Sequence, residues 1–390
     1  MPNVGLPQLL QTPVVTRAVQ SFLTPMSRIQ MEFGVLSNPE TGETGPNCRP
    51  IDGVDFRIDV FDSTRLMATV RPRDTGPATK AVQQVAQIPA TCIRSHDKYY
   101  MSDNKVSRMR QIGGQYGELD ARGTAYVTKQ EAFAAQQLRN LREFVMGMML
   151  RGKLYLKQVG DRFVPTSSSS GAAATIDFKV PATQAFTYGA AMADNLTLGT
   201  VSNIILNAAP WNNTGTDIIT DLLEIDQGSE QVNGRPFTHF WLNSATWGKI
   251  INNTSIRNTG GSVNRPFETW EQWNAMGQRR TGGTATLRGY PHAVFHICNE
   301  VLYDSGTGAN VEMFPEGYIA AHPDVDNTWF EMIEGTELQR ETKVDDPAPK
   351  TGIAAWVEPT TQPSGFELIT LDNFLPTLNV NTAIAFFRVY

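Results

Sequence analysis

The chain has 390 residues, 41% of them hydrophobic, and its 33 basic and 39 acidic residues give a formal net charge of −6. This length allows two or three domains or one elaborate domain. The acidic balance argues against a protein whose main task is to grip nucleic acid, because that task needs a basic face. Three widely separated cysteines (Cys48, Cys92 and Cys298) include no CxxC pair, which disfavours a structural zinc or redox centre and suits a reducing compartment.

The N-terminal residues show no basic segment followed by an apolar core, so we expect no signal peptide. No apolar run approaches the ~18 residues that a membrane-spanning helix needs, so we expect no membrane association. Residues 1–53 are rich in proline and in polar turns, which is typical of an arm that frays or that orders against a neighbour.

Residues 54–127 are predicted to form an extended loop of two long strands. Its tip falls at residues 70–80, where proline, glycine and charged residues cluster. A two-stranded hairpin is marginally stable alone in water. We therefore expect the extended loop to lie on another subunit.

Residues 128–152 predict the longest helix, about 36 Å long at ~1.5 Å per residue. Thr128 and Glu131 have the spacing of a capping box, and Gly152 suits the position just after a helix. Apolar residues at steps of three and four predict one buried face. These residues are Ala134, Leu138, Leu141, Val145 and Met148.

Polar residues of the same helix are candidates for contacts between subunits. Arg139, Arg142 and Glu143 are expected on its polar faces. Two further strands, at residues 153–159 and 174–181, complete a segment that spans residues 128–193.

Residues 194–330 predict a compact α/β domain, with a helix that begins near Asp217 and a second helix capped by Ser244. The tail, residues 331–390, mixes strands with proline-rich turns. Its last run, residues 383–390, is expected to add a strand to a sheet of earlier elements, and the tail is expected to return to the long helix.

Four metal-compatible side chains share the same parity in a predicted strand: His292, His296, Cys298 and Glu300. The two histidines would lie ~13 Å apart on a strand, too far for one ion, so we predict no metal site. His322, Asp324 and Asp326 are interpreted as a polar turn. The sequence contains no phosphate-binding glycine loop and no hydrolase motif, so we expect neither a catalytic nor a cofactor-binding residue.

The tryptophans cluster in the middle of the chain and are interpreted as core or interface anchors. They are Trp211, Trp241, Trp247, Trp270 and Trp273.

The order of the predicted elements resembles the major capsid proteins of tailed phages, in particular the lambda-like capsid protein E family. Short local patterns in the matching order carry this resemblance. They are Ile88-Pro89, Arg108 to Gln111, Gly117-Glu118, Gly152-Lys153, Ile176 to Phe178, Trp211 with Asp217-Ile218, Gly234 to Pro236, the FWLNSATWGKI stretch and Glu312 to Pro315.

The resemblance implies an α+β capsid shell fold with an N-terminal arm (1–53), an extended loop (54–127), a peripheral domain with a spine helix (128–193), an axial domain (194–330) and a C-terminal segment that returns to the peripheral domain (331–390). It implies a virion protein, assembled in the host cytoplasm, that forms hexamers and pentamers of an icosahedral shell. Its partners would be other copies of itself, a portal, a decoration protein and packaged double-stranded DNA, bound by non-specific contacts only.

Some relatives carry a scaffolding segment that is later removed, but this chain starts with a short arm that has no long charged helical run. We therefore expect a separate scaffolding protein and no large maturation cleavage. Lys80 lies near the position where some relatives cross-link, but no matching Asn and Glu can be assigned. Arg71, Arg73 and Asp74 at the loop tip are further candidates for contacts between subunits.

Two other functions are compatible with the sequence. A cellular nanocompartment shell has the same fold and would enclose an enzyme instead of DNA. An oligomeric hydrolase or metalloenzyme would use either the pair His292 and His296 or the pair His322 and Asp324. A phage tail or fibre protein is disfavoured because the chain has no internal repeats.

Overall fold

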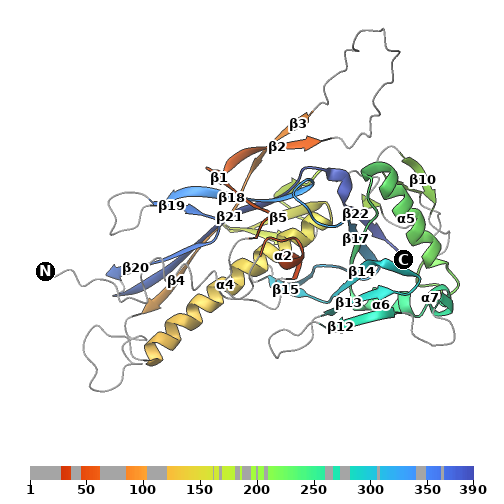
Figure 1. Cartoon of the computed structure of the whole chain (residues 1–390). Coiled ribbons are helices and arrows are strands. Elements are labelled where there is room, and N and C mark those ends of the chain that lie inside the picture. Colours follow the sequence, from red (N-terminus) through yellow and green to blue (C-terminus); the bar gives the residue numbers. More distant parts are fainter. Residues whose placement is uncertain are drawn as a thin grey trace, which may run out of the picture. The chain divides into compact units, whose positions relative to one another are not determined.

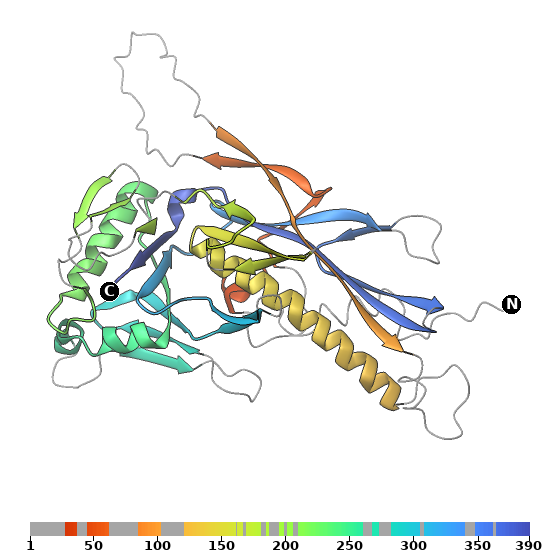
Figure 2. The ribbon, with the colours of Figure 1, turned by 180° about the vertical axis from the view of Figure 1, so that it is seen from behind.

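The computed structural model describes residues 28–36, 45–61, 85–102, 121–160, 162–166, 169–180, 185–186, 195–198, 201–205, 210–259, 267–272, 282–304, 308–339, 348–361 and 364–390. The chain forms two compact units (Figures 1 and 2). The first unit comprises Met1–Arg57, Pro89–Phe144 and Glu331–Thr377, and the second comprises Ile58–Ile88, Val145–Phe330 and Leu378–Tyr390. Each unit is therefore assembled from separate parts of the sequence. The predicted domain boundaries stay a prediction.

The first unit is built on a six-stranded sheet. Its central path runs β1 (Cys48–Asp52), β18 (Phe330–Gln339), β21 (Ser364–Leu378) and β20 (Ala354–Thr361), with β19 (Ala348–Thr351) on β18 and β4 (Ile93–Ser102) on β21. β1 is parallel to β18, whereas β20 and β4 are antiparallel to β21. The long strand β21 thus joins segments that lie more than two hundred residues apart in the sequence.

A long helix, α4 (Ala121–Leu150), contributes the other half of the core of this unit, together with the short helix α2 (Arg28–Glu32). Figure 1 shows α4 as a single continuous rod. Apolar side chains of α4 pack with those of β4, β20 and β21 because the helix spacing and the strand alternation each leave one apolar side. This cluster consists of Met101, Val127, Ala134, Ala135, Leu138, Ile353, Ala355, Val357 and Leu368.

The predicted start of the long helix is wrong. The helix begins at Ala121, so Thr128 lies inside it and caps nothing. Glu131, the expected partner of Thr128 in a capping box, is buried in the helix interface. The predicted end is confirmed, because Gly152 has a φ of 82° and its N–H donates to Met149 O.

The expected extended loop is present only in part. β2 (Asp55–Phe61) and β3 (Val85–Thr91) pair with each other as a two-stranded ribbon, and the tip between them lies outside the described residues. The following strand, β4, pairs with β21 of the same chain over ten residues, from Ser102↔Gly365 to Ile93↔Phe374. The expectation that this strand belongs to an exposed loop is therefore wrong, because its apolar side, including Met101, packs in the core.

The second unit contains a seven-stranded mixed sheet. Its order is β12 (Phe267–Gln272), β13 (Gly282–Leu287), β14 (Tyr290–Cys298), β11 (His239–Leu242), β17 (Tyr318–His322), β22 (Ala385–Arg388) and β8 (Ala185–Phe186). Three helices, α5 (Ile218–Asn233), α6 (Ser244–Ile251) and α7 (Thr254–Thr259), supply apolar residues to the same core as one face of this sheet. The expectation of a compact α/β arrangement in this part of the chain agrees with this architecture.

The N-terminal caps of α5 and α6 can be compared with those that the sequence suggested. The predicted helix start near Asp217 is confirmed, and Asp217 caps α5, because its side chain accepts a hydrogen bond from the backbone N–H of Thr220. α6 is capped by Asn243, whose side chain accepts from the N–H of Thr246 at 2.8 Å. The prediction of Ser244 as the cap is therefore wrong by one residue.

Smaller sheets complete the second unit. β5 (Lys153–Val159) pairs with β6 (Arg162–Thr166) and with β7 (Ala174–Asp177), β9 (Asn195–Leu198) pairs with β10 (Val201–Ile205), and β15 (Val301–Asp304) pairs with β16 (Ala309–Glu312). A short 3-10 helix, η3 (Asn381–Ala383), precedes β22. The predicted final strand is confirmed, since β22 pairs antiparallel with β17. In the described part of the chain, no helix has the length and apolar character needed to cross a membrane.

Candidate subunit-contact residues and polar clusters

Three of the predicted contact residues cannot be placed. Arg71, Arg73 and Asp74 lie outside the described residues, as does Lys80. Their role at a subunit contact stays a prediction.

The three polar candidates on α4 are not exposed. Arg139 is 2% exposed, Arg142 3% and Glu143 0%. The prediction that they lie on exposed faces is wrong, because the second half of α4 is buried on nearly all sides. Apolar residues all round a helix mark it as an interior helix, and here the buried set includes Phe144, Val145, Met146, Met148, Met149 and Leu150.

Glu143 holds the short helix α2 within the first unit. Its carboxylate accepts hydrogen bonds from the backbone N–H groups of Ile29, at 2.5 Å, and Gln30, at 3.1 Å. The Gln30 side chain donates to Glu143 at 3.0 Å and to the backbone carbonyl of Arg139 at 3.1 Å. A carboxylate that accepts several N–H groups is stabilised in its charged form. Glu143 therefore connects α4 to α2 of the same chain.

Arg142 is the centre of a buried charge cluster. Its Nε and Nη2 donate to Asp372 at 2.8 and 2.6 Å, and its Nη1 donates to Glu334 at 2.8 Å. The guanidinium also lies 5.1 Å from the centroid of the Phe374 ring. Burial lowers the pKa of Arg142, but the charges of Asp372 and Glu334 outweigh this and hold the pKa above its ordinary value. Arg142 therefore ties α4 to β18 and β21 as a permanent cation.

A row of histidines lies on the face of the seven-stranded sheet opposite to the helix-covered core. Residues 239 and 241 of β11 alternate with the core residue Phe240, so their side chains point away from that core. His239 stacks on His296 and on His322, with ring centroids 5.2 and 5.0 Å apart, and Trp241 stacks on His296 at 4.2 Å. Three adjacent strands, β14, β11 and β17, thus contribute one layer of rings.

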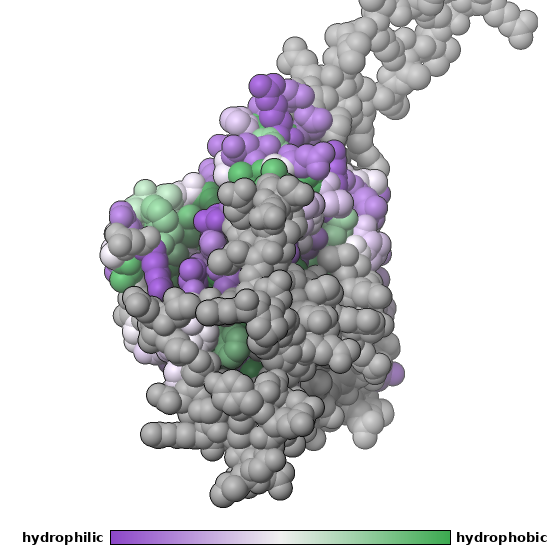
Figure 3. Space-filling model, turned by 90° about the vertical axis from the view of Figure 1, so that its left-hand side faces the viewer, coloured by the Kyte–Doolittle hydropathy of each residue, from purple (hydrophilic) through white to green (hydrophobic). Residues whose placement is uncertain are grey.

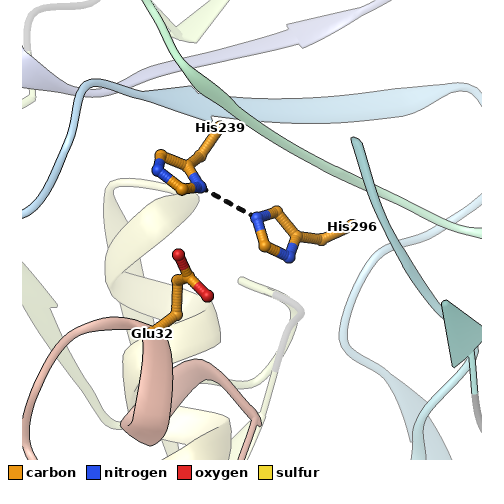
Figure 4. Close-up of side chains that lie close together, drawn as sticks. All are labelled: Glu32, His239 and His296. Carbon is orange, nitrogen blue, oxygen red and sulfur yellow. Dashed lines mark hydrogen bonds between the residues drawn. The ribbon is translucent and has the colours of Figure 1, made fainter. Parts of the chain in front are cut away.

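The hydrogen bonds of this row form a continuous chain. Asp324 accepts from His239 Nε2 at 3.1 Å, and His239 Nδ1 lies 2.9 Å from His296 Nε2, the contact drawn in Figure 4. Since a neutral imidazole has one donor and one acceptor nitrogen, this order makes His296 the donor to His239. His239 Nδ1 and His296 Nε2 are therefore engaged with each other, and His239 Nε2 is engaged with Asp324.

His322 belongs to the same layer but has separate partners. It is fully buried, accepts a hydrogen bond from Trp241 Nε1 at 2.9 Å and donates through Nδ1 to the carbonyl of Pro323 at 2.7 Å. Burial first, and then the neighbouring His239, lower its pKa well below the ordinary value. His322 is therefore neutral. Asp326, in the following turn, forms an ion pair with Arg235.

His292 does not share the position of His296, although both are in β14. It bonds Asp226 of α5 at 2.6 Å, and Asp226 also accepts from the backbone N–H of Phe237 at 3.2 Å. The pairing of β13 with β14 shifts between Ala285 and Leu287, so strict alternation along β14 does not hold. The prediction that the four metal-compatible side chains share one face is therefore wrong for His292.

Two carboxylic acids that the sequence presented as a capping residue and as a metal-compatible side chain are buried in the structure. Glu131 of α4 and Glu300, just after β14, are 2% and 4% exposed. Among the described residues, Glu131 Oε1 and both oxygens of Glu300 have no hydrogen-bond partner. Burial raises the pKa of each to about 7. In the sequence, Glu131 can be noticed as a glutamate among the apolar residues of a predicted helix. Only the tertiary contacts show that its side chain is buried.

The sequence suggested that the clustered tryptophans are either core or interface anchors. Those whose side chains the structure describes are core residues. Trp211, Trp241 and Trp247 are all buried. Apolar side chains also reach the surface: Figure 3 shows green residues among purple ones on the described part of the face it draws. The exposed large hydrophobic residues are Met31, Tyr100, Phe133, Phe163, Leu223, Val301, Tyr303 and Leu338.

Comparison with known proteins gives matches at the level of structure. Neither a protein-family model nor a curated protein matches the sequence. The structure of a candidate capsid protein of a prophage of Escherichia coli CFT073 aligns over 98% of this chain and 99% of that one, with a TM-score of 0.51 and 11% identity.

Two other similar structures are a phage-related protein of Bordetella bronchiseptica RB50 and the mature capsid of bacteriophage PhiM1. The first covers 97% of both chains with a TM-score of 0.47 and 10% identity. The second covers 88% of this chain and 85% of that one, with a TM-score of 0.45 and 10% identity. The chain thus has the α+β capsid shell fold that its sequence resemblance implied, a conclusion carried by the alignment with the Escherichia coli prophage protein. The lambda-like family itself stays a prediction.

Proposed function

We propose that this chain is the major capsid protein of a tailed phage, which assembles into hexamers and pentamers of an icosahedral shell around packaged double-stranded DNA. One observation carries the proposal: the likeness to the Escherichia coli prophage protein runs through nearly the whole of both chains.

The charges of the described residues support a structural role. In the first unit, four charged side chains form hydrogen bonds or ion pairs with other groups of the same chain. They are Arg142, Glu143, Glu334 and Asp372. Buried charges that pair in this way cost much when one partner is lost, which suits a subunit whose shape must be reproduced in many copies. We propose a virion location, with assembly in the host cytoplasm.

The same proposal includes a set of partners. These are other copies of the chain, a separate scaffolding protein, a portal, a decoration protein and packaged DNA held by non-specific contacts. The net charge of −6 supports weak contacts with DNA, because tight binding of phosphates needs clustered cations.

A catalytic role is disfavoured by the bonding of the histidines. His292 and Asp226 form a dyad, but among the described residues no serine, threonine or cysteine is bonded to His292 in a way that would make it a nucleophile. His296 and His239 bond each other, and His322 is buried and neutral. We propose that these histidines support the sheet and carry no reaction.

A cellular nanocompartment shell is the second candidate, since it would have the same fold. The two candidates differ in cargo. A phage capsid encloses DNA with the help of a portal, whereas a nanocompartment encloses an enzyme.

The test is sedimentation of the purified chain, alone and with a candidate scaffolding protein, followed by negative-stain microscopy of the fast fraction. We expect closed shells or capsomer-sized rings. A monomer or small oligomer that stays unchanged at all concentrations and with scaffold would overturn the shell proposal. Nuclease-protected DNA in native particles supports the phage capsid, and a co-purifying enzyme supports the nanocompartment.

A further inference from the structure

The small sheet of β6, β5 and β7 in the second unit carries cations on one of its two faces. Strand alternation places Lys153, Tyr155 and Lys157 of β5 on the same side. Val159 belongs to this side as well, and it pairs directly with Arg162 of β6. Arg162 therefore projects on the side of the two lysines. We call this side, defined by Lys153, Tyr155, Lys157 and Arg162, the basic face.

The opposite face of the same sheet is mainly apolar. It includes Leu154, Leu156 and Phe163, and the strand register adds Pro165 and Ile176. Leu154 is fully buried, whereas Phe163 is 58% exposed. The most exposed ring of this sheet therefore lies on the side away from the cations.

Two cations at one end of the basic face share a single acid. Lys153 Nζ and Lys179 Nζ lie 3.8 and 3.9 Å from the same carboxylate oxygen, Oδ2 of Asp177. The two lysine side chains are 51% and 52% exposed, so each ion pair contributes little. One carboxylate balances only one of the two positive charges, which leaves an excess of positive charge at this end.

Lys157 and Arg162, at the other end, carry positive charges as well. Both are exposed, and neither forms an ion pair among the described residues. Their backbone positions are diagonal neighbours across the strand pair, ~7–8 Å apart. Asp161, in the turn between the strands, lies outside the described residues. Even with a full negative charge for Asp161, this end keeps an excess of positive charge.

A stack of two rings holds two further arginines near the start of β5. The Arg151 guanidinium lies 5.5 Å from the centroid of Phe386, Phe386 stacks on Tyr318 at 5.3 Å, and the Arg388 guanidinium lies 6.0 Å from the centroid of Tyr318. In the described part of the chain, neither arginine forms an ion pair with an aspartate or glutamate. Burial lowers the pKa of Arg151, and the groups that act against this are the side chains of Tyr318 and Tyr155. These arginines therefore add positive charge that no described carboxylate balances.

A row of hydroxyl groups crosses the basic face between its two lysines. Tyr155 pairs with Thr166 of β6 on one side and with Thr175 of β7 on the other. Lysine, arginine, threonine and tyrosine are side chains with which proteins contact phosphate oxygens. Lys153 and Lys157 lie ~13 Å apart along the strand, and double-stranded DNA carries one negative charge per ~1.7 Å of its axis. The basic face is therefore long enough to meet several phosphates.

We propose that the basic face binds phosphate groups of the packaged double-stranded DNA without reading its sequence. The inference rests on the proposed shell function and assigns the non-specific DNA contact to one surface. The rival partner is an acidic surface of a second copy. It is disfavoured because the cores of protein interfaces are poor in lysine and rich in aromatic rings, whereas the most exposed ring of this sheet, Phe163, is on the other face. The net charge of −6 keeps the DNA contact weak and local.

The first experiment measures the binding of a fluorescent DNA duplex to the unassembled chain by anisotropy at several salt concentrations. The unaltered chain should bind with a Kd of about 10⁻⁴–10⁻⁶ M at physiological salt, the range of non-specific binding, and more tightly at low salt. The combined variant Lys153→Gln, Lys157→Gln and Arg162→Gln should bind about tenfold more weakly at low salt. Its slope of log K against log salt should be smaller by about three, because each phosphate contact contributes about one.

The matched control removes three exposed cations elsewhere, in the combined variant Lys129→Gln, Lys249→Gln and Arg257→Gln. It should keep the affinity and the slope of the unaltered chain. Circular dichroism shows whether both variants are folded. Equal losses in the two variants would indicate a diffuse effect of net charge and would overturn the assignment, as would an unaltered chain that binds no DNA at low salt.

The second experiment compares lysine acetylation in DNA-filled and DNA-free particles by mass spectrometry. Lys153 and Lys157 should react at least threefold more slowly in filled particles, whereas Lys249 should react equally in both. Equal reactivity of Lys153 and Lys157 in the two kinds of particle would contradict the DNA contact. Protection in both kinds would identify a protein contact instead and would also overturn the proposal. A chain that never forms particles would count against the shell function, whereas the anisotropy experiment tests the basic face by itself.

Discussion

Buried ionisable side chains are the residues on which the stability of this protein depends most. Arg142 is satisfied by two carboxylates, whereas Glu131 and Glu300 are buried without a hydrogen-bonding partner for at least one oxygen in the described structure. A paired buried charge stabilises only while its partners remain, and an unpaired buried acid is stable mainly in its neutral form. The two kinds of site therefore predict opposite responses to substitution.

Replacing Glu131 by glutamine is expected to stabilise the protein above neutral pH. Burial raises the pKa of Glu131 from 4.5 to about 7, so the stability linked to its proton is complete below pH ~4.5 and is lost as the pH rises through about 7. At pH 8 the Glu131→Gln variant should be more stable by roughly 1–3 kcal/mol, since one pKa unit corresponds to ~1.4 kcal/mol. Urea unfolding of the unassembled protein at pH 5 and pH 8 measures this.

The control for that experiment is Glu230→Gln, which alters an exposed carboxylate of α5. It should change the unfolding midpoint equally little at both pH values. A Glu131→Gln variant whose gain in stability is the same at pH 5 and pH 8 would contradict a titrating carboxyl at this site.

Removing Arg142 is expected to be severe. The Arg142→Met variant leaves Asp372 and Glu334 buried without their cation and should lose about 3–5 kcal/mol of unfolding free energy. Arg94→Met is the matched control, because Arg94 forms a bidentate pair with Glu337 at the surface and should lose about 1 kcal/mol or less. Equal losses in the two variants, measured by chemical denaturation, would argue against a special role for the buried cluster.

At the scale of the element, the residue at which a helix begins depends on local contacts, and two neighbouring residues can be equally good candidates for its cap. α6 begins after Asn243 because its amide oxygen accepts the N–H of Thr246, whereas Ser244 uses its own backbone N–H to bond the side chain of Asn299. Both residue types are good caps, so sequence spacing alone does not separate them. In α4, the helix begins at Ala121, before Thr128, and Val127 of this first part packs in the core.

The cap of α6 offers a direct test at this scale. Asn243→Ala should cost about 1 kcal/mol of unfolding free energy, because it leaves a backbone N–H of the first turn without its acceptor. Ser244→Ala should leave the stability almost unchanged and serves as the matched control. Thermal unfolding of both variants compares them directly, and a larger loss for Ser244→Ala would reverse the assignment of the cap.

At the scale of the whole molecule, the fold interleaves distant segments of the sequence. Residues 331–377 return to the unit that holds most of α4, and the residues from Leu378 onward join the other unit through β22. Such non-local pairing has a high entropic cost before the contacts form. Folding of the subunit is therefore expected to be slow relative to a helical protein of the same length.

The loop tip at residues 70–80 provides a prediction for the assembled state. Arg71→Glu combined with Arg73→Glu is expected to permit folding but to block closed shells, because a shell repeats each contact many times although one exposed ion pair contributes little. Lys249→Glu with Arg257→Glu, on α6 and α7, makes the same change in net charge and should assemble normally. Particle yield by sedimentation and microscopy is the measurement, and normal shells from the double variant of the tip would refute its role.

The sequence by itself determined the alternation of elements and much of their type. Helical periodicity identified α4 and its end at Gly152, a helix that begins near Asp217 was identified as α5, and the apolar run at residues 383–390 identified a strand in a sheet of earlier elements. These are local signals, because a cap or an apolar repeat depends on residues only a few positions apart. The order of elements was also sufficient to indicate the capsid shell fold.

Only the tertiary structure decided which polar residues are covered. Arg139, Arg142 and Glu143 read as surface residues from helix spacing, yet partners from α2, β18 and β21 bury them. β4 read as part of an exposed loop, yet it pairs with β21. In each case the deciding contact joins residues more than one hundred positions apart. Burial of a charge depends on what packs against it from elsewhere in the chain, and a periodic pattern within one segment contains no information about that partner.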